Sequence, residues 1–473
     1  MIEHVNDLKL QFLVELSKLG DQCAAIESEL AGWLSDHDFT YGDQTIPFLL
    51  MPHFISPGQV RVLQRAVHAI MPVLDRFCAA YPEDGALREE LDLPEDEDAL
   101  ARLDPGFAES VRICRLDAFL HNYDIRFLEF NSDSPAGIGW CDVLFEGLRR
   151  GVALPQVTSV FHTLYTPMLP ALIDTLLDAY GQMQARHPDF PERPRLAVVD
   201  VAGTPTASEF RLVAGAASER GLDAVVAGVD ELAYDGSTLR VDGEPVHLVY
   251  RRALAPEVAG SHLAAAVQDG RACVVNPLRA TVASSKKILA VLQDPRFDYL
   301  LRGDEAETIR ATLPWTRILR PGRSTYGPWR FDLLTFVSDN RERLVLKPAS
   351  DYGGRGVILG NETDQATWDA TIEAHAPAHD FIAQEYVAIP EEMFPMVEEG
   401  RVQMRLKRFN VNPFAIGGRY AGMLTRISDQ AVINVAAGGG ILPTVIGRHR
   451  RRLLLEHEND EPQQLPEITG VSL

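Results

Sequence analysis

Four polar side chains on two neighbouring strand-like segments have the types and spacing of a small metal site. Side chains two residues apart on a strand share a face, so Arg115 points the same way as Asp117. Glu129 and Asn131 share a face in the same manner. A polar turn centred on Tyr123 sets an antiparallel register that places Asp117 opposite Glu129 and Arg115 opposite Asn131. We therefore expect the four side chains to converge.

The chemistry of this set favours magnesium. Two carboxylates and an amide oxygen, without a nearby histidine or cysteine, are hard ligands suited to Mg²⁺ held together with substrate phosphates, and they disfavour zinc. Arg115 would place a fixed positive charge beside a transferring phosphoryl group or a tetrahedral intermediate. The alternative is an ordinary hairpin in which Arg115 only neutralises Asp117 or Glu129.

A glycine-rich loop between two apolar strands is a candidate phosphate site. In ERLVLKPASDYGGRGVILG the first strand ends at Lys347, and the loop contains Gly353, Gly354 and Gly356. Glycines allow consecutive backbone N–H groups to face an anion, and the lysine adds a point charge. The Walker pattern G-x-x-x-x-G-K-[ST] is absent. Taken alone, such a loop is equally compatible with a plain hairpin.

Two further segments would complete a nucleotide site. Lys286 and Lys287 begin an apolar helix, and one of them could reach a cleft; the alternative is a solvated lysine pair. In DFIAQEYVAIP, Gln384 and Glu385 interrupt an apolar strand and could offer a backbone edge to adenine and a carboxylate to ribose. By itself this segment is an ordinary strand.

The elements that position these residues predict an α/β (α+β) chain of several parts. A capping box at Ser56 and Gln59 starts a helix in the N-terminal region. A long helical stretch follows the hairpin, and a β-α-β unit with a capping box at Thr206 and Glu209 follows that. This unit lacks G-x-G-x-x-G, so no dinucleotide is assigned to it. The expected parts are a helical region (1–110), the metal-binding part (111–190), a Rossmann-like domain (191–275), the nucleotide-binding part (276–450) and a partly disordered tail (451–473).

Composition excludes several classes of function. The formal net charge of −22 over 473 residues would repel a nucleic-acid backbone, so a small-molecule partner is expected. The first twenty residues do not have the pattern of a signal peptide, and no apolar run is long enough to span a bilayer. Five scattered cysteines are typical of reduced thiols in a cytoplasmic protein.

The order of these motifs, over residues 110–447, resembles the circularly permuted ATP-grasp family, and within it the synthetase domain of glutathionylspermidine synthetase. In ordinary ATP-grasp chains the nucleotide lysines and the hinge precede the metal-binding acids, whereas here CRLD and FLEFNSDSP come first. These two segments match the family's R-x-D and L-E-x-N-x-D-[ST]-P patterns in internal spacing. GRYAGMLTRISDQ departs from the glycine-rich form expected near the C-terminus.

The resemblance implies a role for each matched residue. It implies magnesium ligation by Asp117, Glu129 and Asn131, and stabilisation of the transition state by Arg115. It places the ATP site at Lys286, Lys347, Gly353, Gly354, Arg355, Gly356, Gln384, Glu385 and Val387. The segment from RLAVVDV to VYRR, with Arg251 and Arg252, is similar to the middle domain of permuted ATP-grasp proteins.

The resemblance also implies an activity, that of an ADP-forming carbon–nitrogen ligase. With ATP and Mg²⁺ as cofactors, such an enzyme activates a small carboxylate as an acyl phosphate and joins it to an amine. The alternatives are a phosphotransferase that uses the same site and an inactive nucleotide-binding partner protein. Residues next to the metal strand and in the middle domain are candidate substrate contacts: Ser132, Asp133, Ser134 and Arg251. The acid, the amine, any part for glutathione or a polyamine, and the oligomeric state stay open.

Overall fold

The N-terminal residues form helices around a few short strands. The computed structural model describes residues 2–151, 153–158, 161–350, 353–449 and 471–472. Its N-terminal elements are α1 (Ile2–Leu19), α2 (Cys23–Asp36), β1 (Thr40–Tyr41), β2 (Gln44–Thr45), β3 (His53–Ile55), α3 (Pro57–Ala80), α4 (Gly85–Leu91) and α5 (Glu95–Ala101). The predicted capping box of α3 is confirmed, because Gln59 N donates to Ser56 Oγ (3.2 Å) and Ser56 N to Gln59 Oε1 (3.0 Å).

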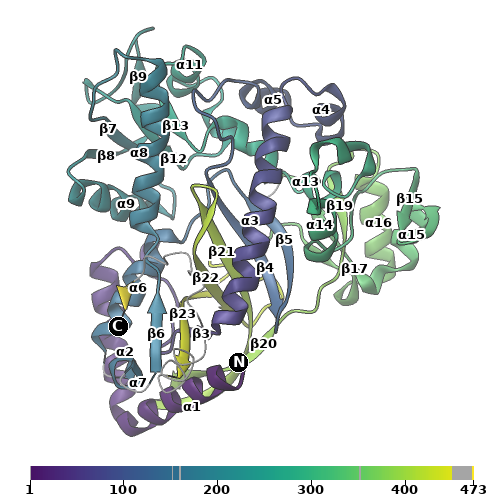
Figure 1. The fold of residues 1–473 in the computed structure, drawn as a ribbon. Coiled ribbons are helices and arrows are strands. Elements are labelled where there is room, and N and C mark those ends of the chain that lie inside the picture. The colour runs from purple at the N-terminus through teal and green to yellow at the C-terminus, as the bar shows by residue number, and fades with distance from the viewer. Residues whose placement is uncertain (1, 152, 159–160, 351–352, 450–470, 473) are drawn as a thin grey trace, which may run out of the picture.

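A large sheet joins the metal-binding segments to strands near the C-terminus. Its order is β24-β6-β23-β22-β21-β4-β5, with β3 on β23 and β20 on β21, and α3 crosses it in Figure 1. Phe414 pairs with Arg115 and Val411 with Ala118, so chain segments about 300 residues apart become neighbours. The strands are β4 (Ile113–His121), β5 (Asp124–Asn131), β6 (Phe161–Tyr165), β20 (Glu391–Glu398), β21 (Arg401–Ile416), β22 (Arg419–Ser428), β23 (Gly440–His449) and β24 (Val471–Ser472).

The long helical stretch predicted after the hairpin is wrong. The structure has α6 (Ile138–Arg150), α7 (Ala153–Thr158), strand β6 and α8 (Leu169–Arg186) in this region. In β6 the side chains of Phe161, Thr163 and Tyr165 are buried in alternation, and the strand pairs antiparallel with β23. Pairing with a distant strand therefore overrides the local helical tendency.

A four-stranded parallel sheet with the order β13-β12-β7-β8 follows. Its strands are β7 (Arg195–Asp200), β8 (Asp223–Gly228), β12 (Leu248–Arg251) and β13 (Cys273–Val275), and its helices are α9 (Ala207–Glu219), α10 (Ala255–Val258) and α11 (His262–Gln268). A small antiparallel sheet of β9 (Leu232–Tyr234), β10 (Leu239–Val241) and β11 (Glu244–Pro245) extends it.

Helix α9 begins where the sequence predicts, but its capping box is wrong. The Thr206 side chain makes no capping hydrogen bond. Glu209 Oε1 instead accepts from Gly137 N (2.8 Å) and Gly139 N (3.1 Å) at the start of α6. Glu209 is buried, so its carboxylate joins two parts of the chain rather than closing its own helix turn.

The segment that carries Lys347 belongs to a further antiparallel sheet with the order β14-β19-β17-β18. Its strands are β14 (Thr316–Ile318), β17 (Leu344–Pro348), β18 (Ile358–Leu359) and β19 (Phe381–Glu385), with the hairpin β15 (Arg323–Tyr326) and β16 (Trp329–Asp332) beside it. The helices are α12 (Thr281–Ser284), α13 (Lys287–Val291), α14 (Glu305–Thr312), α15 (Leu333–Asp339) and α16 (Gln365–His375). Figure 1 shows this part at the right of the large sheet.

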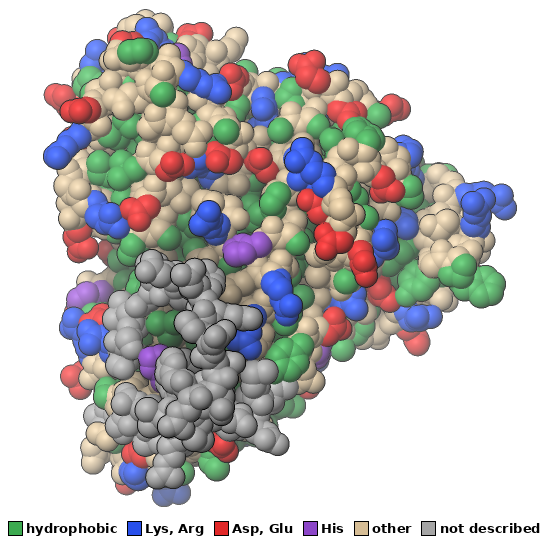
Figure 2. All heavy atoms as spheres, viewed as in Figure 1, with side chains coloured by type: hydrophobic (Ala, Val, Ile, Leu, Met, Phe, Trp, Pro, Cys, Tyr) green, Lys and Arg blue, Asp and Glu red, His purple; other side chains and the backbone are tan. Residues whose placement is uncertain are grey.

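The molecule has the mixed α/β fold that the sequence predicts. Most of the predicted tail, residues 451–470 and 473, lies outside the described residues. Among the residues that are described, no helix combines the length and the apolar character needed to cross a lipid bilayer. On the face in Figure 2, acidic and basic side chains are interspersed over the described elements.

Candidate active site

The predicted register of the β4–β5 hairpin is confirmed. Arg115 lies opposite Asn131 and Asp117 opposite Glu129, with a bulge immediately after Asp117. All four side chains line one cleft. The period-two pattern of the two strands is thus sufficient to bring two carboxylates, an amide and a guanidinium to one face.

Two arginines hold the Asp117 carboxylate. Arg115 Nε donates to Asp117 Oδ1 (2.7 Å), and Arg426 Nη2 from β22 donates to Asp117 Oδ2 (2.5 Å). Burial alone would raise the pKa of the Asp117 carboxyl, but the two guanidinium groups hold this pKa well below its usual value. The carboxylate is therefore ionised at neutral pH, as a metal ligand must be.

Arg426 is a residue that the sequence reasoning missed. It lies in GMLTRIS, a strand segment without another charged residue, and a lone charge in such a run is the signal that could have found it. Asn410 Oδ1 accepts from Arg426 Nε (3.3 Å) and Asn412 Oδ1 from Arg426 Nη2 (3.1 Å). These contacts aim the guanidinium at Asp117 and into the cleft.

The two predicted lysines approach the hairpin from the other side of the cleft. Lys286, at the N-cap of α13, places Nζ 3.5 Å from Glu129 Oε2. Lys347 Nζ donates to Gln384 Oε1 (2.6 Å) and to Leu128 O (3.3 Å). The two lysines therefore meet the carboxylate hairpin at Glu129 and at the neighbouring Leu128. The neighbouring Lys287 points elsewhere, to Asp92 at 3.8 Å.

The Lys347 ammonium is buried, and its environment weakens its proton affinity. Burial lowers the pKa of Lys347 to about 8, with a further lowering by the charge of Lys286, while Glu129 and Asp117 oppose the shift. The phosphates of a bound nucleotide would favour the charged form. Near neutral pH this side chain is protonated and can act as a phosphate ligand.

The glycine loop lies at the open side of the same cleft. Gly353 (φ 67°) and Gly354 (φ 73°) have left-handed backbone conformations and line the cleft. Asn434 Nδ2, from the loop after β22, donates to Gly353 O (2.6 Å). A Cβ on Gly354 would come within 2.2 Å of Val432 Cγ1, so only glycine fits here. Arg355 is exposed and does not line the cleft.

The predicted hinge residues lie at the end of β19 and just beyond it, and they line the same cleft. Gln384 is buried, and its Nε2 donates to Thr316 Oγ1 (3.1 Å). Glu385 Oε1 accepts from the Tyr326 hydroxyl (2.7 Å). Val387 lies just beyond β19 and lines the cleft. The cleft lining thus combines apolar side chains with the charged side chains of the hairpin.

The cleft brings together most of the sequence-predicted site. The predicted residues that line it are Arg115, Asp117, Glu129, Asn131, Lys347, Gly353, Gly354, Gln384, Glu385 and Val387. Lys286 reaches it through Glu129, whereas Arg355 and Gly356 do not line it. The roles assigned to these residues stay predictions.

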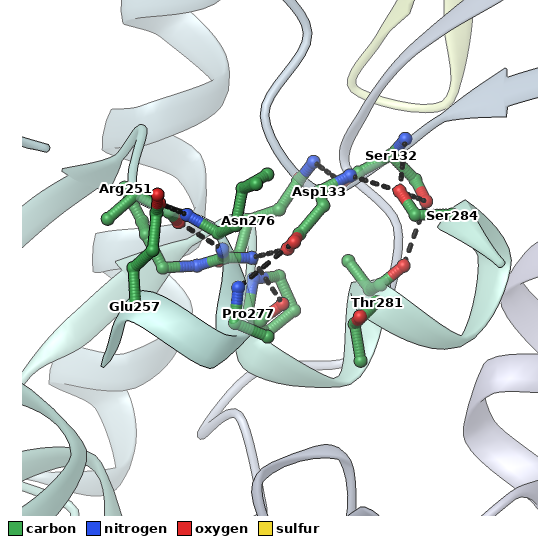
Figure 3. Close-up of polar contacts among 12 residues, drawn as sticks. Ser132, Asp133, Arg251, Glu257, Asn276, Pro277, Thr281 and Ser284 are labelled. Carbon is green, nitrogen blue, oxygen red and sulfur yellow. Dashed lines mark hydrogen bonds and ion pairs between the residues drawn. The ribbon is translucent and has the colours of Figure 1, made fainter. Parts of the chain in front are cut away.

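The four candidate substrate contacts do not line this cleft. Ser132, Asp133 and Arg251 are almost fully buried, and Asp133 forms an ion pair with Arg251 (Figure 3). Ser134 is partly exposed but lies outside the cleft lining. The three buried side chains make polar contacts with other parts of the protein. Their assignment as substrate contacts stays a prediction.

The donor set at the hairpin fits magnesium. Mg²⁺ is held in proteins by one or two carboxylates together with phosphates and water, and Asp117, Glu129 and Asn131 supply such a partial set. No three His, Cys, Asp or Glu side chains form a metal-binding group within the part of the chain that the structure describes.

Comparison of the coordinates with solved structures identifies the fold. A glutathione synthetase-like effector from Globodera pallida aligns with 91% of this chain and 97% of its own, at a TM-score of 0.60 and 13% identity. The chain has the fold of that effector. A candidate γ-glutamylcysteine synthetase from Methylobacillus flagellatus aligns over 84% of this chain and 90% of its own, with 10% identity and a TM-score of only 0.42. No protein-family model and no curated protein match the sequence.

Proposed function

We propose that this protein is an ATP- and magnesium-dependent ligase that forms an amide or peptide bond and releases ADP and phosphate. The observation that carries the proposal is the meeting of the two halves of the cleft at Glu129. A metal-binding carboxylate lies 3.5 Å from one phosphate-binding lysine, Lys286, and shares a cleft with the other, Lys347. A nucleotide triphosphate with its metal ion needs such an arrangement of opposite charges in one place.

The proposed core is a circularly permuted ATP-grasp. The carboxylate hairpin precedes Lys347 in the chain, yet both line one cleft, which supports the permuted order. The fold shared with a protein named glutathione synthetase-like supports a synthetase activity. The substrates of the present chain are proposed only as a carboxylate and an amine.

Each part of the cleft has a role in this reaction. Asp117, Glu129 and Asn131 would hold Mg²⁺, which supplies charge neutralisation between phosphate oxygens. The two lysines and the glycine loop bind the phosphates, and apolar side chains of the cleft, among them Val387, take the base.

In the first chemical step, an oxygen of the substrate carboxylate bonds to the terminal phosphorus of ATP while the bond to the ADP oxygen breaks. The amine nitrogen then bonds to the acyl carbon, phosphate leaves, and the amine loses a proton. Arg115 and Arg426, fixed beside Asp117, neutralise the negative charge that develops on the transferring groups.

The direct test is a screen of small carboxylates paired with amines for stimulated release of ADP. The proposal predicts a pair that yields ADP, phosphate and a product whose mass is the sum of acid and amine less one water. ADP accompanied by a phosphorylated acid or alcohol, without condensation, would instead establish a phosphotransferase.

A further inference from the structure

The buried side-chain amide of Asn276 hydrogen-bonds to both strands of the β4–β5 hairpin at one end. Asn276 Nδ2 donates to Ile113 O (2.6 Å) and to Ser132 O (2.5 Å). Its Oδ1 accepts from Ile113 N (2.9 Å) and Arg112 N (3.2 Å). One side chain thus bonds the first residue of β4 and the residue that follows β5, which fixes the end of the hairpin nearest the metal ligands.

An ion pair anchors the same strand exit to the parallel sheet. Asp133 Oδ1 accepts from Arg251 Nη2 at the end of β12, and Asp133 Oδ2 accepts from Ala255 N (3.1 Å). The Arg251 and Asp133 side chains are 0% and 1% exposed. Arg251 Nε also donates to Asn276 O (3.1 Å), so the contacts of Asn276 and the ion pair form one network, drawn in Figure 3.

Ser284 connects this network to the lysine segment. Its Oγ accepts from Ser132 N (3.1 Å) and Asp133 N (2.8 Å), the two backbone amides that follow Asn131. Ser132 Oγ donates to Ala280 O (2.8 Å), which leaves it free to accept from the Ser284 hydroxyl at 3.2 Å. Figure 3 shows Ser284 reaching from its helix to both residues.

Ser284 lies close in the chain to one of the two phosphate-binding lysines. Ser284 ends α12, two residues before Lys286. Lys286 N donates to Ala349 O (2.9 Å), two residues beyond Lys347. A continuous path of hydrogen bonds and backbone therefore runs from the metal strand through Ser284 to both phosphate-binding lysines.

We infer that Ser284 is a positioning residue that sets the separation between the metal-binding carboxylates and the phosphate-binding lysines. The inference rests on the proposed function of the cleft. Without the Ser284 hydroxyl, two backbone N–H groups at the exit of β5 lose their acceptor, and the strand end that carries Asn131 moves to find another. Mg²⁺ needs near-ideal octahedral geometry, so metal affinity suffers more than binding of the nucleotide itself.

The test compares Ser284→Ala with Ser284→Thr, which keeps the hydroxyl. Mn²⁺, a spectroscopic substitute for Mg²⁺, is titrated by EPR into protein saturated with a non-hydrolysable ATP analogue, and analogue binding without metal is measured by calorimetry. We expect Ser284→Ala to weaken Mn²⁺ binding about tenfold, the loss typical of groups that orient metal ligands. Metal-free analogue affinity should stay within about twofold, and Ser284→Thr should resemble the unmodified protein.

Two further variants complete the design. Ser261→Ala removes a helix-capping serine of α11 and should leave Mn²⁺ binding unchanged. Ser284→Cys, nearly isosteric with a weaker acceptor, should give an intermediate loss and serves if the alanine variant does not fold.

Three results would decide against the inference. Unchanged Mn²⁺ affinity in Ser284→Ala would overturn it and leave the proposed function intact. Equal losses of Mn²⁺ and metal-free analogue binding would also overturn it, since general damage explains them. Unmodified protein that binds neither metal nor analogue would overturn the proposed function together with the inference.

Discussion

At the residue scale, a metal ion that binds the Asp117 carboxylate must compete with the two guanidinium groups that already contact it. Arg115 and Arg426 contact both carboxylate oxygens. A cation at Asp117 competes with these two guanidinium groups for the carboxylate, and phosphate oxygens are strong acceptors for the guanidinium groups. We therefore expect metal and nucleotide to bind cooperatively rather than independently.

Arg426→Met tests this residue directly. Loss of a guanidinium aimed at the reacting groups should lower kcat for substrate-stimulated ADP release about 100-fold, as for other lost electrostatic donors. The matched control is Arg405→Met on the adjoining strand β21, because Arg405 is exposed and pairs only with groups outside the cleft, Glu398 and Gln403. Equal rates for the two variants would exclude Arg426 from the reaction.

The buried His53 side chain should make the free energy of unfolding depend on pH. Burial, with a smaller contribution from Lys9, lowers the pKa of His53 to about 3. An unfolded chain has a histidine pKa of about 6.5, so below that pH only the unfolded state binds the proton. Stability should fall by up to about 1.4 kcal/mol per unit as pH decreases from about 6.5 towards 3.

His53→Gln should remove this slope, measured by urea unfolding between pH 7 and pH 5. His37→Gln replaces an exposed histidine and serves as the control. A slope that His53→Gln leaves unchanged would assign the acid sensitivity to other groups.

At the element scale, the glycine loop is shaped by its contact with the segment after β22. Gly353 and Gly354 both have positive φ, but only Gly354 approaches another side chain, that of Val432. An alanine at either position meets backbone strain of about 1 kcal/mol. At Gly354 the added methyl group also collides with the neighbouring segment.

Gly354→Ala should therefore weaken nucleotide binding more than Gly353→Ala, by about tenfold. Calorimetric titration of a non-hydrolysable ATP analogue measures the difference. Equal affinities would show that the close approach to Val432 does not shape the bound loop.

Elements with strong local patterns are the ones that the sequence predicts. The β4–β5 register follows from period-two spacing around one turn, and the α3 cap follows from Ser56 and Gln59. Strand β6 is not predictable in this way, because its pairing with β23 decides its conformation. The same holds for Glu209, whose two partners lie about 70 residues earlier in the chain.

The candidate site is predictable to the same extent. The hairpin residues, Lys347 and the loop glycines lie in recognisable local motifs. Arg426 and Asn434 come from strands and loops that reach the cleft only through the large sheet. No local sequence pattern indicates that β22 lies two strands from β4 in the sheet, so the contribution of these residues to the site is recognised only from the structure.

At the scale of the whole molecule, the cleft lies between two sheets with different parts in the chemistry. The large sheet supplies the carboxylates and arginines, and the smaller antiparallel sheet supplies Lys347 and the hinge. The network around Ser284 joins them, and the parallel sheet anchors that network through Arg251. Charge of both signs in one cleft allows an anionic nucleotide to bind a protein whose net charge is −22.

The most direct test of this account is the effect of Mg²⁺ on nucleotide affinity in Glu129→Gln. With Mg²⁺, Glu129 is a ligand of the shared ion, so the variant should bind a non-hydrolysable ATP analogue about tenfold more weakly than the unmodified protein. Without Mg²⁺, the carboxylate only repels the phosphates, so the variant should bind equally well or better.

The matched control is Asp124→Asn, at the turn end of the same hairpin and outside the cleft lining. It should keep the unmodified response to Mg²⁺ in the same calorimetric titrations. An analogue affinity that Glu129→Gln lowers equally with and without Mg²⁺, or does not change at all, would contradict a metal-bridged nucleotide between the two halves of the cleft.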